Sequence, residues 1–160
     1  MSVINANWNK WIFASVSKHF DTYRGTLPMF VEGQVRDTHD TKDFFELRMD
    51  GPNYTEYSKG YFRVYIEVNC LLQSAMDDID FHRIHRNLGI VASIFTRPIV
   101  IKKYGDTPII DDGSTLGCLS LISDDRGKEK VQTSQFGQIT QKDKLIQAIV
   151  EAHYEIFLTV

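Results

Sequence analysis

Apolar and polar residues alternate without a break along GYFRVYIEVNC, residues 60–70. Every even-numbered position from Phe62 to Cys70 is apolar, the pattern of a strand that lays one face on a core. The odd-numbered positions carry aromatic, charged and amide side chains: Tyr61, Arg63, Tyr65, Glu67 and Asn69. The pattern predicts a long strand, from about Gly60 to Leu72, with one buried face and one mixed face.

The mixed face is a candidate contact surface. Tyr and Arg are enriched at protein interfaces, whereas a strand facing plain solvent more often carries Thr, Lys and Ser. We therefore expect Tyr61, Arg63, Tyr65 and Glu67 to contact another subunit. An ordinary solvent-facing strand is the alternative.

Apolar side chains at spacings of three and four predict two helices. The first runs from about Trp8 to Arg24, and Gly25 suits the left-handed residue that follows a helix end. The second is introduced by DDID, residues 77–80, whose carboxylates favour a helix N-terminus, and it is stopped by Pro98.

Shorter apolar runs predict the remaining strands. These runs are MFVEGQV (29–35), DFFELRM (43–49), IVIKKYG (99–105), TLGCLSLIS (115–123) and VQTSQFGQI (131–139). DGPN at 50–53 predicts a turn. The C-terminal HYEIFLTV fits a strand best, although the spacing around it also fits a helix. The sum is an α+β fold over residues 1–160: one domain with a mostly antiparallel sheet and two helices packed on one face.

Composition narrows the class of protein. The 160 residues are 42% apolar, enough for one core, and 18 Lys and Arg against 21 Asp and Glu give a net charge of −3. That balance excludes a basic footprint over the whole protein. Without an apolar run of about 20 residues or a signal-peptide layout, we expect a soluble protein made in a cytoplasm, with buried free thiols at Cys70 and Cys118.

Candidate chemistry is sparse. His82 and His85 form an H-x-x-H pair that could present two nitrogens to a metal, but no acid or cysteine stands at ligand spacing. His19 lies on the apolar stripe of the first helix, where a hydrogen-bonded core histidine is the common case. Three alternate positions form a possible acid–base cluster or a solvated face: Glu151, His153 and Glu155. We expect no cofactor, and a small metal-dependent hydrolase remains an alternative.

Basic residues gather where acidic ones are missing. From Phe81 to Gly105 there is no Asp or Glu, but there are five cations: Arg83, Arg86, Arg97, Lys102 and Lys103. This predicts a local basic surface for an acidic partner or for nucleic acid, unless it is a solvated helix face. Ile90 and Ile94 fall beside these arginines, away from the helix's own apolar stripe, and we expect them in a subunit contact. A loop of the same chain could cover them instead.

The order of these segments resembles the tail terminator (tail completion) proteins of long-tailed bacteriophages. The segments are NWNKWIFASVSKHF, LPMFVEGQ, GYFRVYIEVNC, LGCLSL and the closing AIVEAHYEIFLTV. The resemblance implies a virion protein, assembled in the host cytoplasm, that forms a six-membered ring on the end of the tail tube. Its partners would be copies of itself, the major tail tube protein and the head–tail connector protein, with DNA only passing through the lumen.

The resemblance also implies a role without catalysis or membrane contact. Another head–tail neck or connector component would have the same features. Three loops are candidate arms that contact neighbouring rings: residues 35–43, 104–114 and 123–133.

Overall fold

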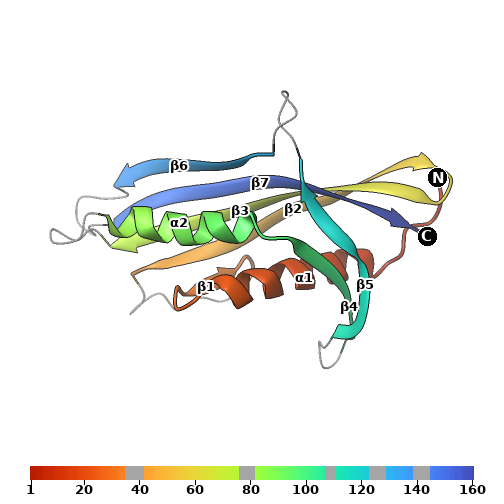
Figure 1. Ribbon diagram of the computed structural model, residues 1–160, viewed down its shortest axis with the longest axis horizontal. Coiled ribbons are helices and arrows are strands. Elements are labelled where there is room, and N and C mark those ends of the chain that lie inside the picture. Colours follow the sequence, from red (N-terminus) through yellow and green to blue (C-terminus); the bar gives the residue numbers. More distant parts are fainter. Residues whose placement is uncertain (35–41, 76–81, 107–110, 123–128, 139–144) are drawn as a thin grey trace.

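Two helices and seven strands make up the described part of the chain (Figure 1). The computed structural model describes residues 1–34, 42–75, 82–106, 111–122, 129–138 and 145–160. The helices are α1 (Trp8–Tyr23) and α2 (Arg83–Phe95). The strands are β1 (Met29–Val31), β2 (Phe44–Ser58), β3 (Tyr61–Ala75), β4 (Ile99–Tyr104), β5 (Asp111–Leu121), β6 (Val131–Gln138) and β7 (Leu145–Thr159).

The strands form one curled, mixed sheet in the order β1-β2-β3-β7-β5-β4, with β6 also paired to β7. β1 runs parallel to β2, so the sheet is not purely antiparallel. β2, β3 and β7 lie side by side over almost their whole length, whereas β5 and β4 bend away from them (Figure 1). β6 and β5 share one side of β7, because β6 pairs with residues 146–152 and β5 with residues 154–155.

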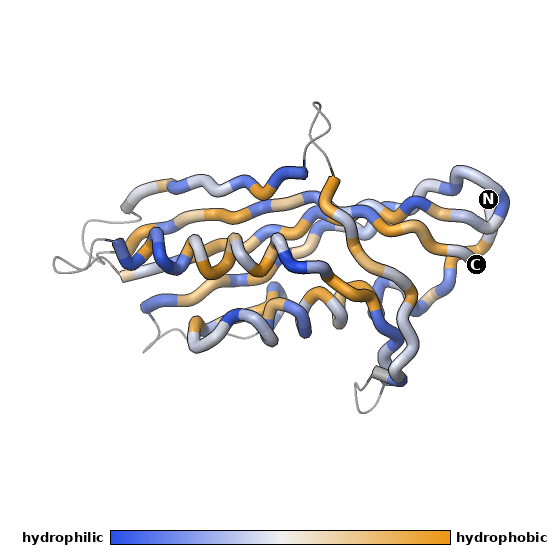
Figure 2. Tube along the Cα trace, viewed as in Figure 1, coloured by the Kyte–Doolittle hydropathy of each residue, from blue (hydrophilic) through white to orange (hydrophobic). Residues whose placement is uncertain are grey.

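The core lies between the long strands and both helices. The even-numbered residues of β3 from Phe62 to Cys70 are fully buried, as their alternation predicted. The ring of Trp8 in α1 packs edge-on against Phe62 at 5.7 Å, and Phe95 at the end of α2 stacks on Tyr154 of β7. Figure 2 shows the contrast in composition, since β7 is largely hydrophobic while its neighbour β6 is mostly pale or blue.

The predicted turn at DGPN is wrong. β2 continues through residues 50–53, and its register against β3 shifts between Asp50 and Asn53. Turn-forming residues are tolerated there because the strand bulges and then resumes pairing. The reversal comes at Gly60, whose φ of +78° favours glycine.

Several other predictions have clear outcomes. The C-terminal segment is a strand, β7, as its β-rich ending predicted. Gly25 follows α1 with a φ of +63°, as predicted. Cys70 is buried and free, but Cys118 is exposed, so the prediction of burial is wrong for that thiol.

Some predictions fall partly outside the described residues. The acidic start proposed for the second helix, residues 77–80, lies there, and so do most of loop 35–43 and parts of loops 104–114 and 123–133. The described ends of the last two loops are shorter than predicted, because β5 begins at Asp111 and β6 at Val131. No helix in the described ranges is long and apolar enough to cross a membrane.

Candidate interface surface

The side of the long strands that faces away from the helices carries the mixed residues predicted from the sequence. The register sets Tyr65 beside Glu155 and Glu67 beside His153, and paired residues project from the same side of a sheet. We call this surface the open face, formed by Tyr57, Tyr61, Arg63, Tyr65, Glu67, Asn69, Glu151, His153, Glu155 and Phe157. Of the four predicted contact residues on β3, Tyr61 and Arg63 are exposed and Tyr65 and Glu67 are half-buried.

One end of the open face is an exposed aromatic cluster. Tyr57, Tyr61 and Phe157 come from β2, β3 and β7 and are 58%, 48% and 56% exposed. The Tyr57 ring lies 5.6 Å from Phe157 and 6.2 Å from Tyr61. Large aromatic side chains with this exposure offer apolar contact area to a partner without needing to move.

Polar pairs occupy the centre of the open face. Arg63 Nε donates to Glu155 Oε2 at 2.6 Å. The hydroxyl of Tyr65 lies 2.5 Å from Nδ1 of His153, and the two rings stack. Asn69 Nδ2 donates to Glu67 Oε1 at 3.3 Å. These contacts hold long side chains in defined positions, which reduces the entropy that a partner would have to remove on binding.

The open face is acidic overall. Burial raises the pKa of Tyr65, and the nearby carboxylates of Glu67 and Asp50 raise it further, while Arg63 opposes them. Glu151 adds another carboxylate, so the carboxylates of Asp50, Glu67, Glu151 and Glu155 outnumber the cations Arg48 and Arg63 on this side of the sheet. An acidic surface repels a phosphate backbone and favours a partner with basic groups.

Ile94 is not on the surface, so its predicted place in a subunit contact is wrong. Its side chain is fully buried, because the last turn of α2 lies against α1 as well as the sheet. His19 of α1 donates to the carbonyl of Ile94 at 3.0 Å, as a core histidine does. Ile90 is 39% exposed and lines a shallow groove of about 650 Å³ with Tyr23, Leu27 and Asn87, among others.

The predicted basic surface is partly engaged within the chain. Arg83 forms an ion pair with Asp43, and Arg97 lies over the Tyr23 ring, 4.4 Å from its centroid. Lys103 lies 5.6 Å from the centroid of Trp11. These contacts tie three of the five cations to neighbouring elements, which favours a structural role for them over phosphate binding.

The histidines do not form a metal site: in the described ranges, no group of three or more His, Cys, Asp or Glu residues could hold a metal ion. The rings of His82 and His85 lie 6.3 Å apart, and His85 Nδ1 is 3.0 Å from Gln135 Nε2. His153 does share a strand face with Glu151 and Glu155, as predicted, but its partner is Tyr65.

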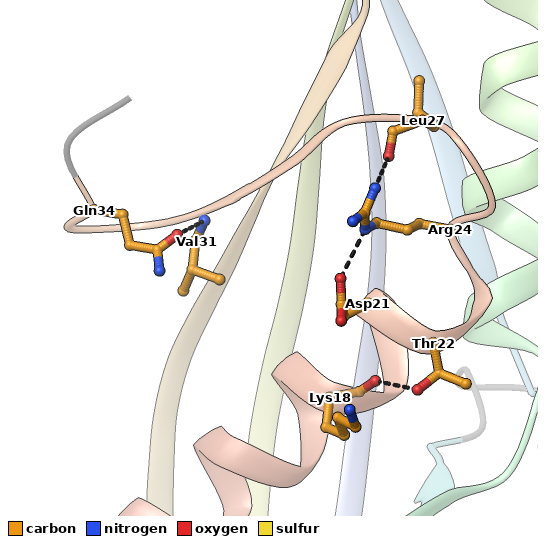
Figure 3. A network of polar contacts seen from close by, with 7 residues as sticks. All are labelled: Lys18, Asp21, Thr22, Arg24, Leu27, Val31 and Gln34. Carbon is orange, nitrogen blue, oxygen red and sulfur yellow. Dashed lines mark hydrogen bonds and ion pairs between the residues drawn. The ribbon is translucent and has the colours of Figure 1, made fainter. Parts of the chain in front are cut away.

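Sequence reasoning missed a groove between α1 and β1. It has a volume of about 710 Å³. Its lining combines apolar residues (Phe13, Ala14, Met29 and Val31) with charged ones (Lys18, Asp21 and Glu32). Figure 3 shows the loop beside it, where Arg24 Nε donates to Asp21 and the Arg24 guanidinium donates to the carbonyl of Leu27. We call this hollow the α1–β1 groove. Its only sequence signal is Phe13, an apolar residue off the core stripe of the helix.

No protein-family model matches the chain. No curated protein matches it either. The open face and the α1–β1 groove are therefore the features that bear on the function of this protein.

Proposed function

We propose that the chain is a structural subunit of a bacteriophage tail, a tail terminator that closes into a six-membered ring on the end of the tail tube. The ring stops tube growth and presents the surface on which the head connector docks. The subunit performs no catalysis and takes no cofactor. This proposal joins the resemblance in segment order to the properties of the open face.

The observation that carries the proposal is the open face itself. Its aromatic cluster and its ordered polar pairs lie on strands whose opposite side is covered by both helices. Broad, rigid surfaces with aromatic anchors and polar pairs suit protein–protein contact. Repeating such contacts around a ring multiplies modest affinities, because cyclic closure satisfies every interface at once.

The overall negative charge of the chain supports a passage role. DNA carries one negative charge per about 1.7 Å of helix axis, so an acidic wall does not retain it. A subunit whose net charge is −3 and whose cations are partly engaged fits a ring through which DNA moves without binding. The open face of each subunit would then be free to contact the end of the tube or the connector.

Tube length tests the proposal directly. Purified tail tube protein is polymerised with and without the chain, and tube lengths are measured by electron microscopy. A terminator gives tubes that stop growing and carry one ring, about six chains by mass, at one end only. Continued growth with no bound chain would overturn the proposal.

A neck or connector component would give a different outcome. Such a protein would bind the finished tube end or the head connector but would not stop growth of uncapped tubes. The same assay therefore separates the two roles. Metal content and hydrolysis of ester or phosphoester substrates, measured on the same preparation, test the remaining alternative, a metal-dependent hydrolase.

A further inference from the structure

The outer edges of the sheet differ in whether another element covers them. The edge of β4 is covered by α1, because Ser15 Oγ accepts from the Lys102 N–H at 2.9 Å and Trp11 Nε1 donates to the Tyr104 carbonyl at 2.9 Å. β6, in contrast, pairs only with β7 among the described strands. An exposed strand edge is a template for pairing with another chain.

Within the part of the chain that the structure describes, β6 also has little of the usual protection of an edge strand. Its residues, VQTSQFGQ, include no charged side chain and no proline. Natural edges are commonly blocked by lysine, proline or a covering element. Within the described residues, a bulge between Gln135 and Gly137 is one such device, and the Gln135 side chain also contacts His85 of α2 at 3.0 Å. Beside the bulge, Phe136 is 60% exposed. The strand is therefore suited to pairing, and Phe136 offers an apolar anchor.

The opposite edge of the sheet is formed by β1 and borders the α1–β1 groove. The Val31 N–H donates to Gln34 Oε1 at 3.0 Å, and the Val31 carbonyl accepts from the Gln34 N–H at 3.0 Å. Gln34 thus occupies both outward backbone groups of Val31, as a paired strand would, and Figure 3 shows its side chain folded onto that edge. A two-bond contact from one glutamine can be exchanged for strand pairing at little net loss.

Strand direction makes the two edges compatible between copies. β2, β3, β7 and β6 alternate in direction, and β1 runs parallel to β2. β6 of one copy is therefore antiparallel to β1 of a neighbour that has the same orientation. Contacts between two different surfaces of identical subunits generate rings when the rotation closes.

We propose that β6 of one copy pairs with the β1 edge of the next copy, with Phe136 seated in the α1–β1 groove and Gln34 displaced. The apolar lining of the groove by Phe13 and Met29 matches this side chain in character. The contact rests on the proposed ring, and it assigns the two surfaces that join the subunits. The open face is left free to contact the end of the tube or the connector.

Disulfide trapping between copies tests this contact. In a Cys118→Ser background, a Phe136→Cys chain is mixed with an Ala14→Cys chain and oxidised in the presence of tail tubes. We expect a dimer that contains one chain of each kind, at least tenfold in excess of either homodimer. Tyr61→Cys mixed with Ala14→Cys is the matched control, and it should give no such dimer.

Other products would overturn the proposal. An excess of Phe136→Cys homodimer would mean that β6 pairs with β6 across a two-fold axis. Linkage of Ala14→Cys to the tube protein would mean that the groove receives a different partner. The absence of any specific product, with the chain still bound to tubes, would place the subunit contact elsewhere.

A charged side chain at the position of Phe136, which the proposal seats in the α1–β1 groove, provides a second test of the contact. Phe136→Asp should weaken assembly on tubes at least tenfold in a sedimentation assay, whereas Val100→Asp, at another exposed apolar position, should not. Unchanged circular dichroism would show that both variants fold. The two proposals fail separately: capped tubes without the disulfide would refute only this contact, and the disulfide without a stop to tube growth would refute only the terminator role.

Discussion

Tyr65 and His153 face each other across β3 and β7, with the phenol oxygen 2.5 Å from Nδ1 and the ring centroids 5.7 Å apart. The rings are inclined by only 23°, so the stacking and the hydrogen bond act together. Both side chains are half-buried at the centre of the open face. The pair therefore fixes the surface that the proposed ring would present.

Replacing Tyr65 with Phe should loosen that surface without unfolding the protein. The variant loses one hydrogen bond but keeps the stacked ring, so we expect the free energy of unfolding to fall by only about 0.5–1.5 kcal/mol. Because His153 is no longer held, capping of tail tubes should need several-fold more protein. Urea unfolding and the tube-length assay measure the two effects, and Tyr23→Phe is the control on another surface.

The buried face of the long strands could be predicted from the sequence, because apolar residues at every second position are typical of a strand with one side on the core. Every even-numbered residue from Phe62 to Cys70 is buried, and β7 alternates in the same way. The odd face remained open to interpretation, since alternation says which side is polar but not what covers it. The ladder that brings Tyr65 to His153 depends on pairing between residues 88 positions apart.

Ile94 shows that the apolar stripe of one helix does not identify every buried residue on that helix. The periodicity of one helix identifies the face toward the sheet, but a second helix that packs nearby widens the buried arc. Here α1 meets the last turn of α2, through the rings of Phe20 and Phe95 at 5.0 Å. The α1–β1 groove was unpredictable for the same reason, because it exists only between elements that tertiary packing brings together.

Two serines on α1 should respond in opposite directions to replacement by alanine. Ser15 is buried and bonds both the N–H and the carbonyl of Lys102, whereas Ser17 Oγ is buried with no hydrogen-bond partner. Ser15→Ala should lower the free energy of unfolding by about 1–3 kcal/mol. Ser17→Ala should raise it by a few tenths, because alanine has the higher helix propensity. Equal effects in urea denaturation would contradict this assignment.

His19 should make the protein sensitive to mild acid. Burial lowers the pKa of His19, the hydrogen bond to the Ile94 carbonyl partly offsets that effect, and the charge of Arg97 lowers the pKa again. A pKa below the unfolded value, about 6.5, means that the stabilisation is complete above that pH. It is lost as pH falls through the folded pKa, since the unfolded chain takes up the proton first.

Replacing His19 with Gln tests this effect. The variant should lose less stability than the parent chain between about pH 7 and pH 5, whatever its stability at neutral pH. Unfolding curves in urea at several pH values give the slope for each chain. An unchanged slope in the His19 variant would refute the assignment.

Reversing the charges of the Arg63–Glu155 pair distinguishes a contribution to folding stability from a contribution to binding a partner. Arg63 is 48% exposed and Glu155 25% exposed at the side chain, so the pair contributes only about 0.2–1 kcal/mol to folding. Arg63→Glu should therefore unfold at nearly the same urea concentration as the parent but cap tubes poorly, since the ordered pair is replaced by two neighbouring carboxylates that repel each other. Adding Glu155→Arg restores the internal pair. If the open face contacts a partner, that double variant folds normally and still caps poorly, because the partner meets the charges in exchanged positions.

Lys10→Glu, which breaks the exposed pair with Asp106 at 2.5 Å, is the matched control and should cap as the parent does. Full recovery of capping in the double variant would show that the pair serves the fold alone.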